Sequence, residues 1–90
     1  MWVNPLVRHP GMIGSVIPSS QQLVDTMLEG VDWQRTRLFV EYGPGIGTFT
    51  RTILDRLPAD ATLLAIDLNA DFIDYLGRHI ADPRLRLVHG

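Results

Sequence analysis

A glycine-rich turn between an apolar run and a helical segment constrains this 90-residue chain more than any other feature. The run at 38–42 is short and rich in residues that favour β-strands, and glycines occupy every second position of the turn at 43–47. A second apolar run, at 62–66, ends at Asp67. In an α/β sheet this layout brings bare backbone and a carboxylate to one edge, where a nucleoside-bearing ligand binds.

Hydrophobic periodicity predicts alternating helices and strands after residue 18. Helical spacing of apolar residues predicts three helices, and short apolar runs predict three strands between and after them. The helices are expected from Ser19 or Ser20 to Gly30, from Thr48 to Pro58 and from Asn69 to Pro83; the strands are expected at 38–42, 62–66 and 85–88. With right-handed crossovers, this order predicts an α/β fold, a Rossmann-like three-layer parallel sheet that is incomplete in this chain. Residues 1–18 show no sustained period and are expected to form an irregular leader.

Composition excludes several classes of function. Apolar residues form 46% of the chain, which indicates a globular domain, and a net charge of −2 gives no general attraction to nucleic acid. There is no cysteine, and the three histidines lie too far apart for a zinc motif, so no metal site is expected. No apolar run approaches the ~18 residues of a membrane span, and no secretory signal is evident. A cytoplasmic protein is therefore expected.

The spacing of the glycines separates the candidate nucleotide ligands. A nicotinamide fingerprint needs its third glycine one position later, where this chain has Thr48, and Pro44 removes one amide donor from the turn. Both features count against a pyrophosphate, and the absence of lysine excludes a P-loop. A ligand that needs close backbone approach without phosphate contacts fits better, and S-adenosylmethionine is such a ligand.

Two carboxylates complete the predicted site. Asp67, at the end of its strand, can accept hydrogen bonds from both ribose hydroxyls. Glu41 lies inside a strand, where its charge is costly unless it meets loop amides or a cationic ligand group such as the ammonium or sulfonium. Two alternatives stay open: Glu41 caps the glycine loop, or Asp67 is a helix-entry residue that competes with Asn69.

Three segments resemble the motifs of class I S-adenosylmethionine-dependent methyltransferases. Residues 40–50 resemble the first motif, residues 64–69 the second, and residues 85–90 the approach to the third. Upstream, residues 14–20 are similar to the segment before the first helix of bacterial phospholipid N-methyltransferases, close kin of the ribosomal RNA adenine dimethylases.

The resemblance implies a role for individual residues. Gly43, Gly45 and Gly47 would line the methionine and ribose, Asp67 would hold the ribose hydroxyls, Leu68 would pack on the adenine, and Ile17 to Ser19 would lie against the methionine end or the substrate entrance. It implies residues 19–90 as the N-terminal, cofactor-binding portion of a methyltransferase domain. It names no catalytic base, because the motif that lines the methyl acceptor in this family is absent before Gly90.

Three functions follow as expectations. The first is N-methylation of a phospholipid head-group amine, by a protein that is cytoplasmic or peripheral to the inner membrane. The second is N6-methylation of ribosomal RNA adenine, which the slight acidity of the chain disfavours. The third is a non-catalytic half-domain. Because no partner strand was evident for one side of the run at 38–42, self-association through an unpaired sheet edge is also expected.

Overall fold

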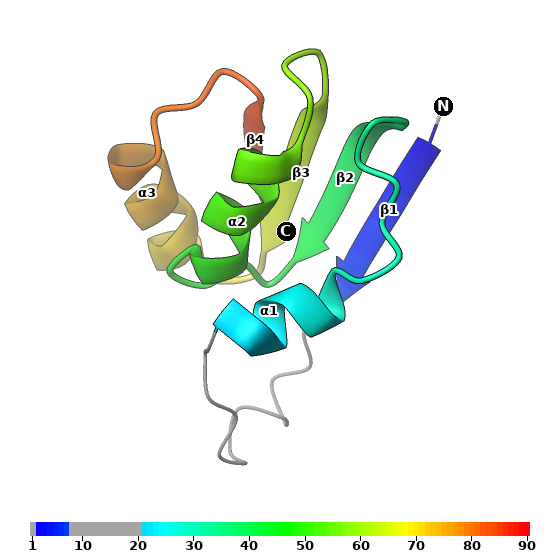
Figure 1. Ribbon diagram of the computed structural model, residues 1–90. Coiled ribbons are helices and arrows are strands. Elements are labelled where there is room, and N and C mark those ends of the chain that lie inside the picture. Colours follow the sequence, from blue (N-terminus) through cyan, green and yellow to red (C-terminus); the bar gives the residue numbers. More distant parts are fainter. Residues whose placement is uncertain (1, 8–20) are drawn as a thin grey trace.

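The computed structural model describes the backbone of residues 2–7 and 21–90, and the side chains of residues 21–90. Strands and helices alternate along the described chain, as Figure 1 shows. The elements are β1 (Trp2–Val7), α1 (Gln21–Met27), β2 (Thr36–Tyr42), α2 (Thr48–Arg56), β3 (Thr62–Asp67), α3 (Ala70–His79) and β4 (Leu85–His89). The four strands form one parallel sheet in the order β1-β2-β3-β4. The predicted α/β, Rossmann-like partial fold is confirmed.

The structure differs from the sequence prediction at residues 2–7. These residues, expected in an irregular leader, form an edge strand that pairs in parallel with β2, with Pro5 opposite Val40 and Leu6 opposite Glu41. The run contains no alternating pattern, and a proline is tolerated in an edge strand because one side of the strand needs no donor. The side of β2 that was expected to be unpaired is therefore occupied by β1, and the edges of the described sheet are β1 and β4.

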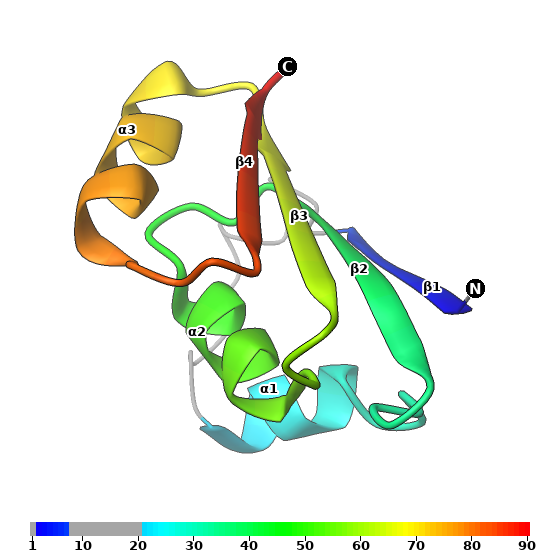
Figure 2. The same cartoon turned by 90° about the horizontal axis from the view of Figure 1, so that it is seen from above.

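All three described helices lie on one face of the sheet (Figure 2). This follows from the strand order, because right-handed crossovers that always step in the same direction place every connecting helix on the same side. Side chains of β2 and β3 accordingly alternate between buried and partly buried positions, with Phe39 and Leu63 buried while Val40 and Leu64 are partly exposed. The described residues form no second helical layer on the opposite face.

The core lies between the sheet and its helices. Phe39 and Leu63 come from the two central strands, Ile53 comes from α2, and Leu76 comes from α3; each is at most 1% exposed. Trp33, in the connection before β2, stacks on Phe39 with the ring centroids 5.7 Å apart. This packing fixes α2 above β2 and β3, and so fixes the turn that joins β2 to α2.

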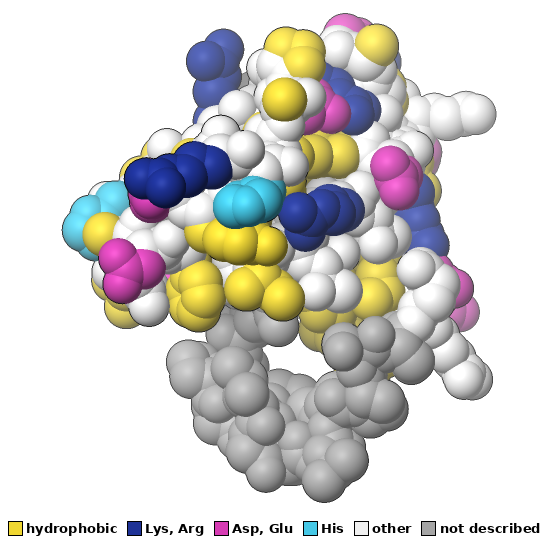
Figure 3. Space-filling model, turned by 90° about the vertical axis from the view of Figure 1, so that its left-hand side faces the viewer, with side chains coloured by type: hydrophobic (Ala, Val, Ile, Leu, Met, Phe, Trp, Pro, Cys, Tyr) yellow, Lys and Arg dark blue, Asp and Glu magenta, His cyan; other side chains and the backbone are white. Residues whose placement is uncertain are grey.

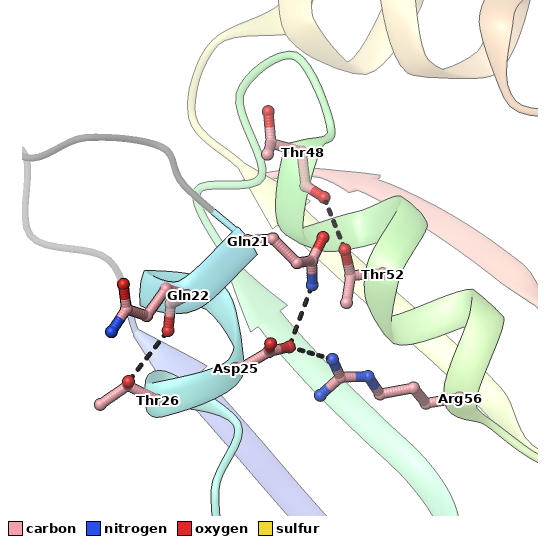
Figure 4. A network of polar contacts seen from close by, with 7 residues as sticks. All are labelled: Gln21, Gln22, Asp25, Thr26, Thr48, Thr52 and Arg56. Atoms are coloured by element: carbon pink, nitrogen blue, oxygen red, sulfur yellow. Dashed lines mark hydrogen bonds and ion pairs between the residues drawn. The ribbon is translucent and has the colours of Figure 1, made fainter.

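Polar contacts dock α1 against α2 on the same face (Figure 4). The Arg56 guanidinium of α2 forms an ion pair with the Asp25 carboxylate of α1, which also accepts a hydrogen bond of 3.0 Å from the Gln21 side-chain amide. Hydrogen bonds from Gln21 and then Arg56 lower the pKa of Asp25 below its ordinary value of 3.8. Since α1 has only seven residues, these contacts and the buried Val24 hold it in place better than its own propensity would.

Candidate functional site

The glycine-rich turn lies at the carboxyl end of β2, beside the end of β3. Gly43, Gly45 and Gly47 have φ angles of 71°, 59° and 93°, in the left-handed region that side chains other than that of glycine rarely adopt. The Gly43 amide donates a hydrogen bond of 2.8 Å to the Ile66 carbonyl of β3. The turn therefore starts tied to the neighbouring strand, and its conformation explains why glycine recurs in it.

Gly47 has a packing role as well as a conformational one. It is the N-cap residue of α2, and a Cβ atom built on it would lie 2.7 Å from Leu76 Cδ2 and 3.1 Å from Ile80 Cδ1. Both of these neighbours come from α3 or its C-cap. The missing side chain thus allows the start of α2 to approach α3 closely, which is a role that ligand binding alone would not require.

Asp67 connects the end of β3 to the glycine turn. Its Oδ2 atom accepts a hydrogen bond of 3.3 Å from the Gly45 amide, and its Oδ1 atom accepts one of 2.9 Å from the Asn69 amide. The side chain of Asn69, in turn, accepts from the Asp71 amide at 2.9 Å and caps α3. Asp67 is therefore not the cap of α3. Its partly buried carboxylate is aimed by two backbone amides and has lone pairs left to accept further donors.

Glu41 is completely buried near the end of β2. Its exposed fraction is 0%, and its Oε1 atom accepts a hydrogen bond of 2.6 Å from the hydroxyl of Thr50, which is also 0% exposed. Thr50 lies in the first turn of α2, where the positive end of the helix dipole favours a nearby carboxylate. The structure thus brings the Glu41 carboxylate to the start of α2.

Apolar side chains are exposed around the same end of the sheet. Leu68, directly after Asp67, is 84% exposed, and Ile46 of the glycine turn is 58% exposed. A ring nitrogen of His89 lies 3.0 Å from the Leu68 carbonyl, and His89 is in register with Asp67 across β3 and β4. Seen from the α3 side, hydrophobic side chains gather on the surface among charged ones (Figure 3). Exposed apolar groups at this end provide a surface for a flat aromatic ligand.

The structure brings most of the predicted site residues together. The glycine turn and Asp67 meet through the Gly45 bond, Leu68 follows Asp67, and Glu41 lies two residues before the turn. Ser19 and residues 17–18, which the resemblance placed over the cofactor, lie outside the described residues. Sequence reasoning missed Thr50 and Ile46. A contact between Thr50 and Glu41 was indicated only by their positions: Thr50 lies three residues after Gly47, in the helix that follows the strand of Glu41.

Two other findings concern the described residues only. Residues 21–90 contain no group of three or more histidine, cysteine, aspartate or glutamate side chains arranged to hold a metal ion. No helix within the described chain has the length and apolar character needed to cross a membrane.

Comparison with known proteins links this arrangement to methyltransferases. The chain is 29% identical over 82 residues to an ornithine lipid N-methyltransferase of Singulisphaera acidiphila, a match that covers 91% of this chain and 43% of the relative. It is 44% identical over 43 residues to the ribosomal RNA small subunit methyltransferase A of Nitrosomonas eutropha, covering 48% of this chain and 16% of that protein. No family model matches the chain.

The two relatives support a methyltransferase family for the chain. Both relatives are named as methyltransferases, and the chain is similar to them in sequence. It spans less than half the length of each of these relatives. The longer match covers the glycine turn, β3 and most of the remaining chain, since 82 of the 90 residues align.

Proposed function

We propose that the chain binds S-adenosylmethionine and forms the cofactor-binding portion of a methyltransferase. The observation that carries the proposal is the contact between the glycine turn and Asp67, in which the Gly45 amide donates to Asp67 Oδ2 at 3.3 Å. A turn with glycine at every second position and a carboxylate with spare acceptor capacity lie side by side at the carboxyl ends of two parallel strands. Ligands of open α/β sheets bind at this end.

The chemistry of the turn favours a cofactor without phosphates. Pro44 has no amide hydrogen, and the Gly45 amide is already engaged by Asp67, so few donors converge at the start of α2 for a pyrophosphate. A ribose diol suits Asp67, and the exposed Leu68 side chain suits an adenine ring. When bound, S-adenosylmethionine supplies a methyl group already activated by its sulfonium, so the protein has mainly to orient the acceptor and exclude water.

The acceptor that we propose is the amine of a lipid head group. The match to a lipid N-methyltransferase extends over 91% of this chain, whereas the match to the ribosomal RNA enzyme covers 48%. The net charge of −2 also gives no electrostatic advantage to an RNA acceptor. The adenine of ribosomal RNA is the second candidate, because the shorter match has the higher identity, 44% against 29%.

Titration calorimetry of the full chain with S-adenosylmethionine tests the cofactor. We expect wild type to bind, and we expect Asp67→Asn to weaken binding by about tenfold or more, because a hydrogen bond to a charged group contributes roughly 1.5–3 kcal/mol. Asp60→Asn is the matched control: Asp60 is exposed and pairs with Arg37 at 3.1 Å, and its replacement should leave affinity unchanged. Equal affinity of the Asp67→Asn variant and wild type would contradict the proposal.

Two retention assays distinguish the acceptors. A lipid enzyme should float with liposomes that contain amine head groups, and an RNA enzyme should be retained by ribosomal RNA. Methyl transfer is then measured with the retained acceptor and radiolabelled cofactor. Cofactor binding without transfer to either acceptor would instead support the third expectation, a non-catalytic half-domain.

A further inference from the structure

The buried pair of Glu41 and Thr50 spans the whole glycine turn. Glu41 lies in β2 before the turn, and Thr50 lies in α2 after it, nine positions further along the chain. The hydrogen bond between their side chains is 2.6 Å long. Both side chains are 0% exposed. The bond therefore closes a loop whose backbone is the candidate cofactor-binding turn.

A carboxylate in this position needs such a partner. Removing a carboxylate from water is costly unless hydrogen bonds replace its hydration, and a hydroxyl that donates to an ionised oxygen makes one of the stronger bonds of its kind. Thr50 is held by its helix, because α2 packs through Phe49, Ile53 and Leu54 into the core. The hydroxyl of Thr50 thus fixes the Glu41 carboxylate from a rigid element.

We propose that Thr50 is a positioning residue for the amino-acid end of the cofactor. Its hydroxyl orients the Glu41 carboxylate toward the positively charged amino-acid end of S-adenosylmethionine. Thr50 touches no ligand atom itself. The inference rests on the proposed function and assigns different parts of the cofactor to different residues. The pair of Glu41 and Thr50 orients the charged amino-acid end, while Asp67 binds the ribose.

Two ligands separate this role from a merely structural one. S-adenosylmethionine carries the ammonium and the sulfonium, whereas methylthioadenosine keeps the adenosine and sulfur but lacks the amino-acid part and both positive charges. A change that acts through Glu41 on the amino-acid end weakens the first ligand and spares the second. A change that damages the fold of the site weakens both.

The test is calorimetry of both ligands with the full chain and four variants. Thr50→Val removes the hydroxyl at nearly constant volume, and we expect S-adenosylmethionine to bind about tenfold more weakly, equivalent to roughly 1.4 kcal/mol, with methylthioadenosine affinity unchanged. Thr50→Ser restores the donor and should recover wild-type affinity. Thr52→Val removes a hydroxyl from the same helix whose 3.4 Å bond to the Thr48 carbonyl is local, and it should change neither ligand. Thr50→Ala is measured as well, and takes the place of Thr50→Val if that variant does not fold by circular dichroism.

Each outcome decides the inference. Selective loss of S-adenosylmethionine binding, with recovery in Thr50→Ser, supports it. Equal loss of both ligands, or no loss of either, overturns it while the proposed function stands on wild-type binding and Asp67→Asn. If wild type binds neither ligand, the proposed function itself is wrong, and this inference falls with it.

Discussion

Replacement of Gly47 by alanine tests how the glycine turn is held against α3. At Gly47 the φ angle is 93°, and the left-handed conformation costs a residue with a Cβ atom roughly 1–2 kcal/mol. The new Cβ atom would also lie 2.7 Å from Leu76 Cδ2, and Leu76 is 0% exposed, so it has little room to move. Overpacking of this kind costs about 1–3 kcal/mol. The expected total is therefore about 2–5 kcal/mol, a large part of the stability of a 90-residue domain.

Gly30→Ala provides the matched control for this prediction. Gly30 has a similar φ of 87°, but a Cβ atom built on it meets nothing within 4 Å. Alanine there should cost only the conformational strain, roughly 1–2 kcal/mol. Urea unfolding followed by far-ultraviolet circular dichroism measures both variants. We expect Gly47→Ala to lower the free energy of unfolding further than Gly30→Ala does, because only its Cβ atom meets Leu76. When Leu76 is shortened to valine, this additional destabilisation by Gly47→Ala should be smaller. Equal destabilisation of the two glycine variants would refute the close-packing argument.

Two further predictions concern the exposed end of β3 and an ion pair. Leu68→Ala should change the free energy of unfolding by less than about 0.5 kcal/mol, because the side chain is 84% exposed. Calorimetry should nevertheless show several-fold weaker binding of S-adenosylmethionine. Unchanged affinity would show that Leu68 is not part of the site. Hydrogen bonds from the Arg84 side chain and backbone lower the pKa of Asp82 below 3.8. The ionised carboxylate therefore stabilises the folded state above pH 3.8. This stabilisation is lost as the pH falls through the lower pKa of Asp82 in the folded state. Asp82→Asn should therefore destabilise the chain at pH ~7 by about 1 kcal/mol, and the difference from wild type in urea unfolding should shrink as the pH falls below 3.8.

The elements from β2 to β4 were predictable because their patterns are local. Apolar runs, glycines and prolines mark where most of these strands and helices begin and end, although α3 ends at His79 and not at the predicted Pro83. Strand β1 was not predictable in this way. Its partner residues lie more than thirty positions away, as with Pro5 and Val40, and the run carries no alternating pattern of its own. Such a strand forms because an edge of β2 is available to pair with it. Its position therefore depends on the assembled sheet and not on its own local sequence.

In the candidate site, too, some contacts were predictable from the local sequence and others depend on how the elements pack. Adjacency of the turn and Asp67 was predictable, because carboxyl ends of neighbouring parallel strands meet at one edge. The hydrogen bond between Glu41 and Thr50 was not predicted, because nothing in the sequence distinguishes Thr50 from the other residues of its amphipathic helix. Only the packing of α2 on the sheet brings its hydroxyl to the buried carboxylate.

The structure bears on the helix-entry role that the sequence left open for Asp67. Asn69, not Asp67, caps α3, because the Asn69 side chain accepts from the Asp71 amide at 2.9 Å. Asp67 instead holds the Asn69 amide at 2.9 Å and the Gly45 amide at the longer distance of 3.3 Å. A residue needed only to start the helix would have no reason to contact a turn 22 positions away. The carboxylate is thus aimed at the glycine turn, and such preorganisation would reduce the entropy lost on binding the ribose diol that we propose as its ligand.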